Sequence, residues 1–188
     1  MRIITGKARG IRLDTLEGLD TRPTSERTKE AVFSMLQFEV AGSEVLDLFA
    51  GSGQMGLESL SRGAMRAHLI DRGRGAHEVI KRNVQKTRLT DGAIVVCEDS
   101  ISFLKRQSGD IKFDIVFIDP PYASTLIDEA LTVIYAKKLV KDSSYIVCES
   151  DRFDFLSEEN TKRFDVIKTM KHGVAHVSVL KARFVEEV

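Results

Sequence analysis

The stretch Val45-Leu-Asp-Leu-Phe-Ala-Gly-Ser-Gly-Gln-Met-Gly56 decides the fold of this chain. A short apolar run leads into a turn with glycines at positions 51, 53 and 56, a spacing that connects a strand to a helix in nucleotide-binding folds. Glycine at the first two positions leaves room for a ligand to approach the backbone, and the helix start presents free N–H groups. We therefore predict a ligand site at this turn, with a turn that only caps the helix as the alternative.

Short apolar runs alternate with amphipathic stretches throughout the chain after this turn. The runs are continuous, as expected for parallel strands covered on both faces: Val45–Phe49, Ala67–Ile70, Ala93–Cys97, Asp114–Ile118 and Tyr145–Cys148. Helices are expected near residues 54–62, 74–87, 100–107 and 125–136. The last two runs, Phe164–Lys171 and Ala175–Phe184, leave no room for a helix between them and predict an antiparallel hairpin at the sheet edge. We predict an α/β fold with a mostly parallel seven-stranded sheet and a C-terminal antiparallel hairpin; by analogy this fits a Rossmann-like methyltransferase better than a dinucleotide-binding fold.

Length and composition indicate one globular domain over residues 1–188, with 28 basic and 28 acidic residues. No apolar run approaches the roughly 20 residues of a membrane span, and the start lacks the apolar segment of a secretory signal. Cys97 and Cys148 lie inside apolar runs and are interpreted as small buried side chains in a reducing cytoplasm. The four histidines show no metal-ligand spacing. We expect a cytoplasmic monomer with no membrane partner and no metal.

The N-terminal arm, residues 1–22, concentrates positive charge in a chain of zero net charge. Residues 1–12 carry four basic side chains and no acid. Ile3-Ile4 and Ile11-Arg12-Leu13 are predicted to pair as a small hairpin, before a helix that begins near Thr24 or Ser25. A polyanion is expected to meet this end, and the predicted RNA contacts are Lys7, Arg9, Arg12, Arg22 and Arg27. The alternative is a short tail that only packs on the domain.

Acidic residues at the ends of the first three runs indicate what the ligand is. Asp47 would repel a pyrophosphate and suits a cationic ligand, such as the sulfonium and amino groups of S-adenosylmethionine. Asp71 is placed to bind ribose hydroxyls, with a cap of the helix that begins near Gly73 as the alternative. Arg72 lies either along an adenine or in solvent. Asp99 either accepts from an adenine amino group or caps the next helix. The predicted cofactor site comprises Asp47, Phe49, Ala50, Gly51, Ser52, Gly53, Asp71, Arg72, Asp99 and Ser100.

The stretch Phe113-Asp-Ile-Val-Phe-Ile-Asp-Pro-Pro-Tyr122 carries the most specific chemistry. Asp119 stands at the carboxyl end of the fourth strand, where open α/β sheets bind ligands. Pro120 and Pro121 remove two N–H donors and leave carbonyls free to accept. Asp119 and a carbonyl that accept the hydrogens of an exocyclic amine stabilise the charge that develops on methyl transfer, while Tyr122 offers a stacking face. The alternative is a rigid turn with a core tyrosine.

Several segments together resemble the RsmD family of bacterial 16S ribosomal RNA guanine-N2 methyltransferases. They are Arg2–Gly10, Arg22–Arg27 with Lys29-Glu30, Leu46–Gly53, Ser61–Gly63 and Cys148–Ser150. The resemblance implies a class I fold and S-adenosylmethionine lined by Asp47, Gly51, Gly53, Asp71 and Asp99. It also implies a target guanine, in 16S ribosomal RNA or the small subunit, held by Asp119 to Tyr122. The family often has Ala-Leu-Gly where Gln54-Met55-Gly56 stands here.

Other functions share part of this pattern. DNA adenine-N6 and protein-glutamine methyltransferases use similar Pro-Pro-aromatic turns, usually with Asn in the place of Asp119. A nicotinamide-dependent oxidoreductase shares the glycines and Asp71 but has no use for Asp119-Pro-Pro-Tyr122. An RNA-binding assembly factor that holds the cofactor without turnover is the non-enzymatic alternative, and methyl incorporation into RNA separates it from the enzyme.

Overall fold

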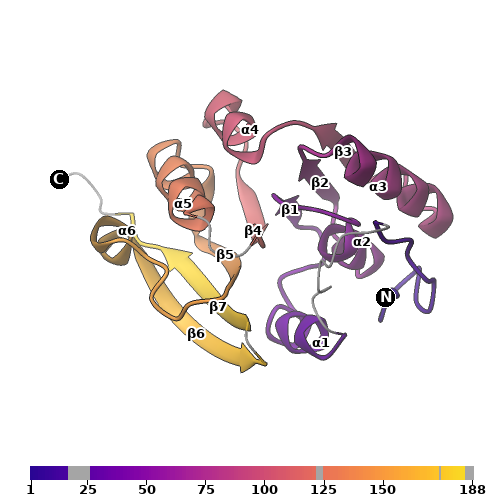
Figure 1. The fold of residues 1–188 in the computed structure, drawn as a ribbon, viewed down its shortest axis with the longest axis horizontal. Helices are drawn as coiled ribbons and strands as arrows, with labels where there is room; N and C mark the ends of the chain where they lie inside the picture. The colour runs from indigo at the N-terminus through magenta and orange to yellow at the C-terminus, as the bar shows by residue number, and fades with distance from the viewer. Residues whose placement is uncertain (17–25, 122–124, 174, 185–188) are drawn as a thin grey trace.

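A single seven-stranded sheet forms the centre of the molecule (Figure 1). The computed structural model describes residues 1–16, 26–121, 125–173 and 175–184. The strand order is β3-β2-β1-β4-β5-β7-β6, in which β1 to β5 are parallel and β7 runs antiparallel to both of its neighbours. The predicted sheet and its C-terminal hairpin are thereby confirmed. The strands are β1 (Glu44–Asp47), β2 (Arg66–Asp71), β3 (Ala93–Cys97), β4 (Phe113–Ile118), β5 (Val140–Ser150), β6 (Phe164–His172) and β7 (Ala175–Ala182).

Helices cover both faces of the sheet, which explains why the strands read as continuous apolar runs. The helices are α1 (Glu26–Met35), α2 (Gln54–Ser61), α3 (Arg74–Thr87), α4 (Ser100–Arg106), α5 (Leu126–Ala136) and α6 (Glu158–Arg163). One apolar core joins the N-terminal arm, α1, α2 and α3 to the face with Val45, and the other joins α4 and α5 to the face with Leu46. The four helices predicted after the glycine turn are confirmed to within one residue at each end.

Some sequence-based expectations need correction or fall outside the described residues. Cys148 is buried as predicted, but the expectation for Cys97 is wrong, because it lies on the edge strand β3 and is exposed. The short helix α6, capped by the Ser157 hydroxyl that accepts from the Asn160 amide, was not predicted. Thr24, Arg22 and Tyr122 lie outside the described part of the chain.

The predicted N-terminal hairpin forms as a single antiparallel bridge between Arg2 and Arg12. The Ile3 amide donates to the Ile11 carbonyl at 3.0 Å, and the Gly10 amide donates to the Ile3 carbonyl at 2.8 Å. Ile3, Ala8 and Leu13 are buried in the core that also contains α1 and α2. The first 16 residues are therefore a packed part of the domain.

Candidate functional site

The glycine turn connects β1 to α2 at the point where the strand order reverses between β1 and β4. Gly53 is the N-cap of α2 with φ +79°, a left-handed backbone conformation that residues other than glycine rarely adopt. A Cβ on Gly56 would lie 2.2 Å from Cδ2 of Leu69, so the start of α2 packs directly against β2. Ligands of open α/β sheets bind at such a reversal, outside the carboxyl ends of the strands.

Asp47 ends β1 and is buried beneath the turn, with 5% of its surface exposed. Its Oδ2 accepts a hydrogen bond from the Gly56 amide at 3.0 Å. Burial raises the pKa of Asp47 to about 7; the Gly56 hydrogen bond opposes this shift and the nearby Asp71 charge adds to it. A positively charged ligand would favour the ionised form, so this carboxyl is suited to a cation.

Asp71 fastens two strand-to-helix turns together at the end of β2. Its Oδ2 accepts from the Gly51 amide at 2.9 Å, and its Oδ1 accepts from the Gly73 amide at 2.8 Å. Gly73 precedes α3, so Asp71 shapes that helix start without being its capping residue. A carboxylate oxygen accepts more than one hydrogen bond, so the predicted contact with ribose hydroxyls is compatible with this arrangement.

Asp99 and Ser100 both serve the start of α4. The Asp99 side chain accepts from the Ser102 amide at 2.9 Å and is the N-cap, and that hydrogen bond holds the pKa of Asp99 below its usual value. The capping alternative is therefore observed for Asp99. Ser100 is buried, and its hydroxyl donates to the Leu48 carbonyl at 2.5 Å. Arg72 is exposed and interacts electrostatically with Asp99, which places both at one rim.

A cavity lies between the ends of β1, β4 and β5 and the inner side of α1. Four residues singled out from the sequence line it: Asp47, Phe49, Ala50 and Asp119. The remaining predicted site residues in the described part of the chain do not line it; they are Gly51, Ser52, Gly53, Asp71, Arg72, Asp99, Ser100, Pro120 and Pro121. The structure therefore divides the predicted site into this cavity and a neighbouring rim at β2 and β3.

Gln54 and Glu149 are polar residues of this cavity that the sequence analysis did not place in the site. Gln54 is 8% exposed, and its Oε1 is buried with no hydrogen-bond partner among the described residues. Buried polar atoms almost always have partners, so this oxygen is an acceptor that lacks its donor. The signal in the sequence was the departure from the family pattern that the resemblance implied at Gln54-Met55-Gly56. Glu149 also lines the cavity, and its carboxylate, with those of Asp47 and Asp119, favours a ligand that donates hydrogen bonds and carries positive charge.

A buried charge cluster fixes the N-terminal arm beside this cavity. Glu58 and Lys29 are both fully buried, with Nζ 3.1 Å from Oε2, and burial lowers the pKa of Lys29 while the Glu58 charge opposes the shift. The Glu58 carboxylate also accepts from the amides of Ile4 at 2.8 Å and Thr5 at 3.0 Å, and from Arg62 Nε at 2.8 Å. The arm is thus hydrogen-bonded to Glu58 of α2, and Lys29 of α1 forms an ion pair with the same carboxylate.

The predicted RNA-contact residues in the described part of the chain are all exposed. They are Lys7, Arg9, Arg12 and Arg27, and none forms an ion pair with another described residue. No group of three or more His, Cys, Asp or Glu in the described ranges is arranged to hold a metal ion. Among the described residues, no helix is long and apolar enough to span a bilayer.

Comparisons with known proteins agree with this geometry. A family model described as conserved hypothetical protein 95 matches residues 1–181. The rRNA methyltransferase candidate YlbH of Bacillus subtilis is 35% identical, over 97% of this chain and 100% of that protein. Ribosomal RNA small subunit methyltransferase D of Haemophilus influenzae is 34% identical, over 81% of this chain and 79% of that protein. The solved structure of the methyltransferase candidate yhhF of Escherichia coli matches with a TM-score of 0.84 and 30% identity, over 97% of each chain. The predicted methyltransferase fold is confirmed.

Proposed function

Because this chain belongs to the family described as conserved hypothetical protein 95, the RsmD family, we propose that it is a ribosomal RNA methyltransferase. We propose further that it transfers a methyl group from S-adenosylmethionine to the exocyclic N2 of a guanine in 16S ribosomal RNA, free or within the small subunit, and that it acts as a monomer. The observation that carries the proposal is the cavity in which Asp47, Gln54 and Asp119 gather acceptor atoms at the strand ends.

The residues present fit the proposed cofactor. The Gln54 Oε1, which has no partner among the described residues, and the buried Asp47 carboxyl would supply acceptors for an amino group and a counter-charge for a sulfonium. The turn residues Phe49 to Gly53 and the rim with Asp71, Arg72, Asp99 and Ser100 would hold the nucleoside part. When bound, S-adenosylmethionine supplies an electrophilic methyl group.

Asp119 is proposed as the residue that acts on the target base. It lies at the carboxyl end of β4, lines the cavity and is exposed, so it is accessible from solvent. Its carboxylate would accept a hydrogen from the exocyclic amine and stabilise the positive charge that develops on that nitrogen. Pro120 and Pro121 fix the backbone beside it, and Tyr122 would stack on the base. The guanine must leave its helix to reach this position.

The arm is proposed to bind the RNA backbone. Lys7, Arg9, Arg12 and Arg27 are exposed and form no ion pair with another described residue; Arg22, predicted from the sequence as a further contact, lies outside the described residues. Phosphate contacts orient an RNA without reading its sequence, whereas the cavity selects the base. Because each lost phosphate contact lowers the salt dependence of binding, replacing Lys7, Arg9 and Arg12 by Ala would flatten that dependence by about one slope unit per contact.

The test is methyl transfer from labelled S-adenosylmethionine to 16S ribosomal RNA and to small subunits from cells that lack this protein, with N2-methylguanosine identified by mass spectrometry. Asp119→Ala is expected to lower the single-turnover rate by about 10²–10³-fold while cofactor affinity is retained. Asp110→Ala, in the exposed loop before β4, is the matched control. Methylation at another base position would overturn the guanine-N2 assignment, and RNA binding without methyl incorporation would indicate an assembly factor.

A further inference from the structure

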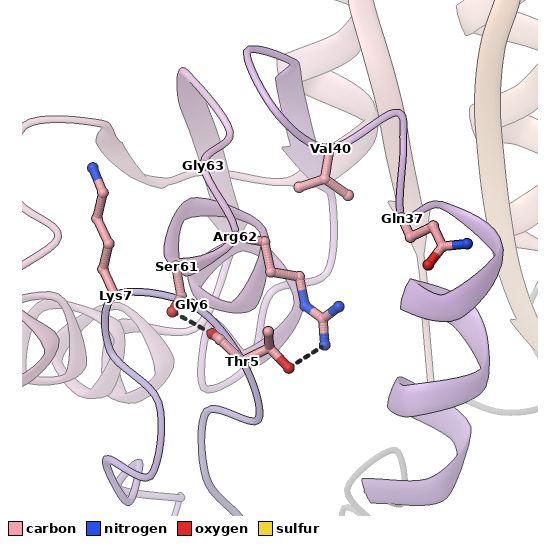
Figure 2. A pocket seen from close by; sticks show the side chains of 8 residues that line it. All are labelled: Thr5, Gly6, Lys7, Gln37, Val40, Ser61, Arg62 and Gly63. Carbon is pink, nitrogen blue, oxygen red and sulfur yellow. Dashed lines mark hydrogen bonds between the residues drawn. The ribbon is translucent and has the colours of Figure 1, made fainter.

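A second hollow of about 590 Å³ lies at the other end of α1 and α2 (Figure 2). It is lined by the arm at Thr5 to Lys7, by the end of α2 at Ser61 to Gly63, and by Gln37 and Val40 after α1. Figure 2 shows Arg62 extending from the end of α2 between Thr5 and Gln37, with Lys7 on the other side of Ser61. This hollow is separate from the cavity with Asp119, with which it shares no residue.

The hollow presents positive charge held in a fixed position. Arg62 is bound through Nε to Glu58 at 2.8 Å and through Nη2 to the Thr5 hydroxyl at 3.1 Å, and its guanidinium lies 4.6 Å from the centre of the Phe33 ring. The Glu58 carboxylate is shared with Lys29, so it does not neutralise Arg62 alone. Lys7 is exposed and has no ion pair with another described residue.

The backbone around the hollow offers few acceptors that would attract a cation. The carbonyls of Glu58, Ser59 and Leu60 accept from the amides of residues 62–64, and the Ser61 carbonyl accepts from the Lys7 amide at 2.8 Å. The Gly63 carbonyl accepts from the Gly42 amide at 2.8 Å. These carbonyls at the end of α2 are therefore already bonded, and the cationic side chains determine what the hollow attracts.

An exposed aromatic residue lies on the segment after α1 that borders the hollow. Phe38 stands between two lining residues, Gln37 and Val40, and is 86% exposed. Phe38 does not itself line the hollow, but an exposed aromatic ring on a segment that borders cationic side chains suits single-stranded nucleic acid, because bases stack on the ring while phosphates meet the cations. Glu39, the acidic residue of the same segment, is also exposed and, like Phe38, does not line the hollow.

We propose that this hollow is a second RNA subsite, in which Arg62 and Lys7 hold a phosphodiester and Phe38 stacks an unpaired base. The inference rests on the proposed function and specifies where the RNA continues beyond the target guanine. The two sites lie at opposite ends of α2, from Gln54 to Ser61, a helical rise of about 11 Å. That separation corresponds to about three nucleotides of a stacked strand. The arm follows α2 between them, from Met1 at Ser52 to Lys7 at Ser61, with Arg2 and Arg12 on its path.

The test compares Phe38→Ala with Phe153→Ala, because Phe153 is also strongly exposed, at 72%, but follows β5, whereas Phe38 stands between the lining residues Gln37 and Val40. RNA affinity is measured by anisotropy of a fluorescein-labelled twelve-nucleotide uridine RNA, and KM and kcat are measured with 16S ribosomal RNA. Phe38→Ala is expected to lower the affinity for the oligonucleotide about tenfold and to raise KM for the ribosomal RNA, while kcat and the affinity for S-adenosylmethionine stay unchanged. Lys7→Glu is expected to lower the affinity for the same oligonucleotide and to make that affinity less dependent on salt concentration.

The inference and the proposed function fail separately. Normal RNA affinity in Phe38→Ala, or an equal loss in Phe153→Ala, would overturn the subsite while wild-type methylation still supported the enzyme. A dimer in size-exclusion chromatography that Phe38→Ala dissociates would assign the hollow to a second copy of the chain and overturn the RNA subsite. A wild-type protein that binds the oligonucleotide through Phe38 but methylates no ribosomal RNA would support the subsite and refute the proposed reaction.

Discussion

Replacing Gly6 by Ala tests whether the arm is fixed to α2 as the structure shows. Gly6 has φ +87°, and a Cβ there would lie 1.8 Å from the Ser61 carbonyl oxygen. A side chain in this left-handed conformation costs about 1–2 kcal/mol by itself. The added methyl group also overlaps a backbone atom, so the arm has to move away from Ser61.

That movement breaks three hydrogen bonds to Ser61. The Lys7 amide donates to the Ser61 carbonyl at 2.8 Å, the Ala8 amide donates to the Ser61 hydroxyl at 2.9 Å, and this hydroxyl donates to the Thr5 carbonyl at 2.6 Å. Each bond contributes about 0.5–1.5 kcal/mol net. With the backbone strain, Gly6→Ala is expected to lower the free energy of unfolding by about 3–6 kcal/mol.

Gly10→Ala is the matched control for this experiment. Gly10 has φ +84°, nearly the same backbone conformation, but no atom lies within 4 Å of a Cβ built there. Gly10→Ala is expected to lower the free energy of unfolding only by the backbone strain, about 1–2 kcal/mol. Urea unfolding gives both free energies, and hydrogen exchange at the Ile4 and Thr5 amides reports whether the arm has left Glu58. Equal losses in the two variants would refute the inferred contact between the arm and α2.

Three further changes probe the buried polar groups. Folding raises the pKa of Asp47 from 3.8 to about 7, so between these pH values the folded protein holds a proton that the unfolded chain releases. The free energy of unfolding therefore falls as pH rises from about 4 to about 7. Measured by urea unfolding, the fall in this free energy between pH 5 and pH 8 should be smaller for Asp47→Asn than for the wild type. Lys29→Met alone should cost about 3–5 kcal/mol, and adding Glu58→Leu should not restore that stability, because the Ile4 and Thr5 amides and Arg62 then lose their acceptor; a double variant as stable as the wild type in urea unfolding would contradict this. Gln54→Leu should raise the free energy of unfolding by about 1–3 kcal/mol, because it removes a buried acceptor that has no partner among the described residues. It should also weaken S-adenosylmethionine binding about tenfold in calorimetry, as expected for one lost hydrogen bond to a charged group; unchanged affinity would remove Gln54 from the cofactor site.

The fold could be predicted because the central strands β1 and β4 are largely buried and read as continuous apolar runs. Continuous apolar runs locate the strands, and parallel strands bring their carboxyl ends to one edge, so Asp47 and Asp119 were expected to meet there. The same reasoning failed for Cys97, because a run on an edge strand has the same composition as one in the centre. Strand order depends on packing between segments far apart in the chain, which the local pattern does not encode.

The buried charges could not be predicted for a related reason. Lys29 and Glu58 stand 29 positions apart in the sequence, and each taken alone reads as a solvated charge on a helix. The structure buries both completely, and the acceptors for the Ile4 and Thr5 amides come from the same carboxylate. A polar partner supplied by tertiary structure leaves no local periodic signal.

The helix α2 shows how such buried polar groups mark the function. All eight of its residues are buried, yet four are polar: Gln54, Glu58, Ser59 and Ser61. Glu58 and Ser61 bind the arm, and the Ser59 hydroxyl donates to the Met55 carbonyl at 2.8 Å. Gln54 is the member of this set whose side-chain oxygen has no partner among the described residues. Since the burial of an unpaired polar atom is costly and Leu would fill the same space without it, the polar side chain at this position is best explained by a donor that arrives with the ligand.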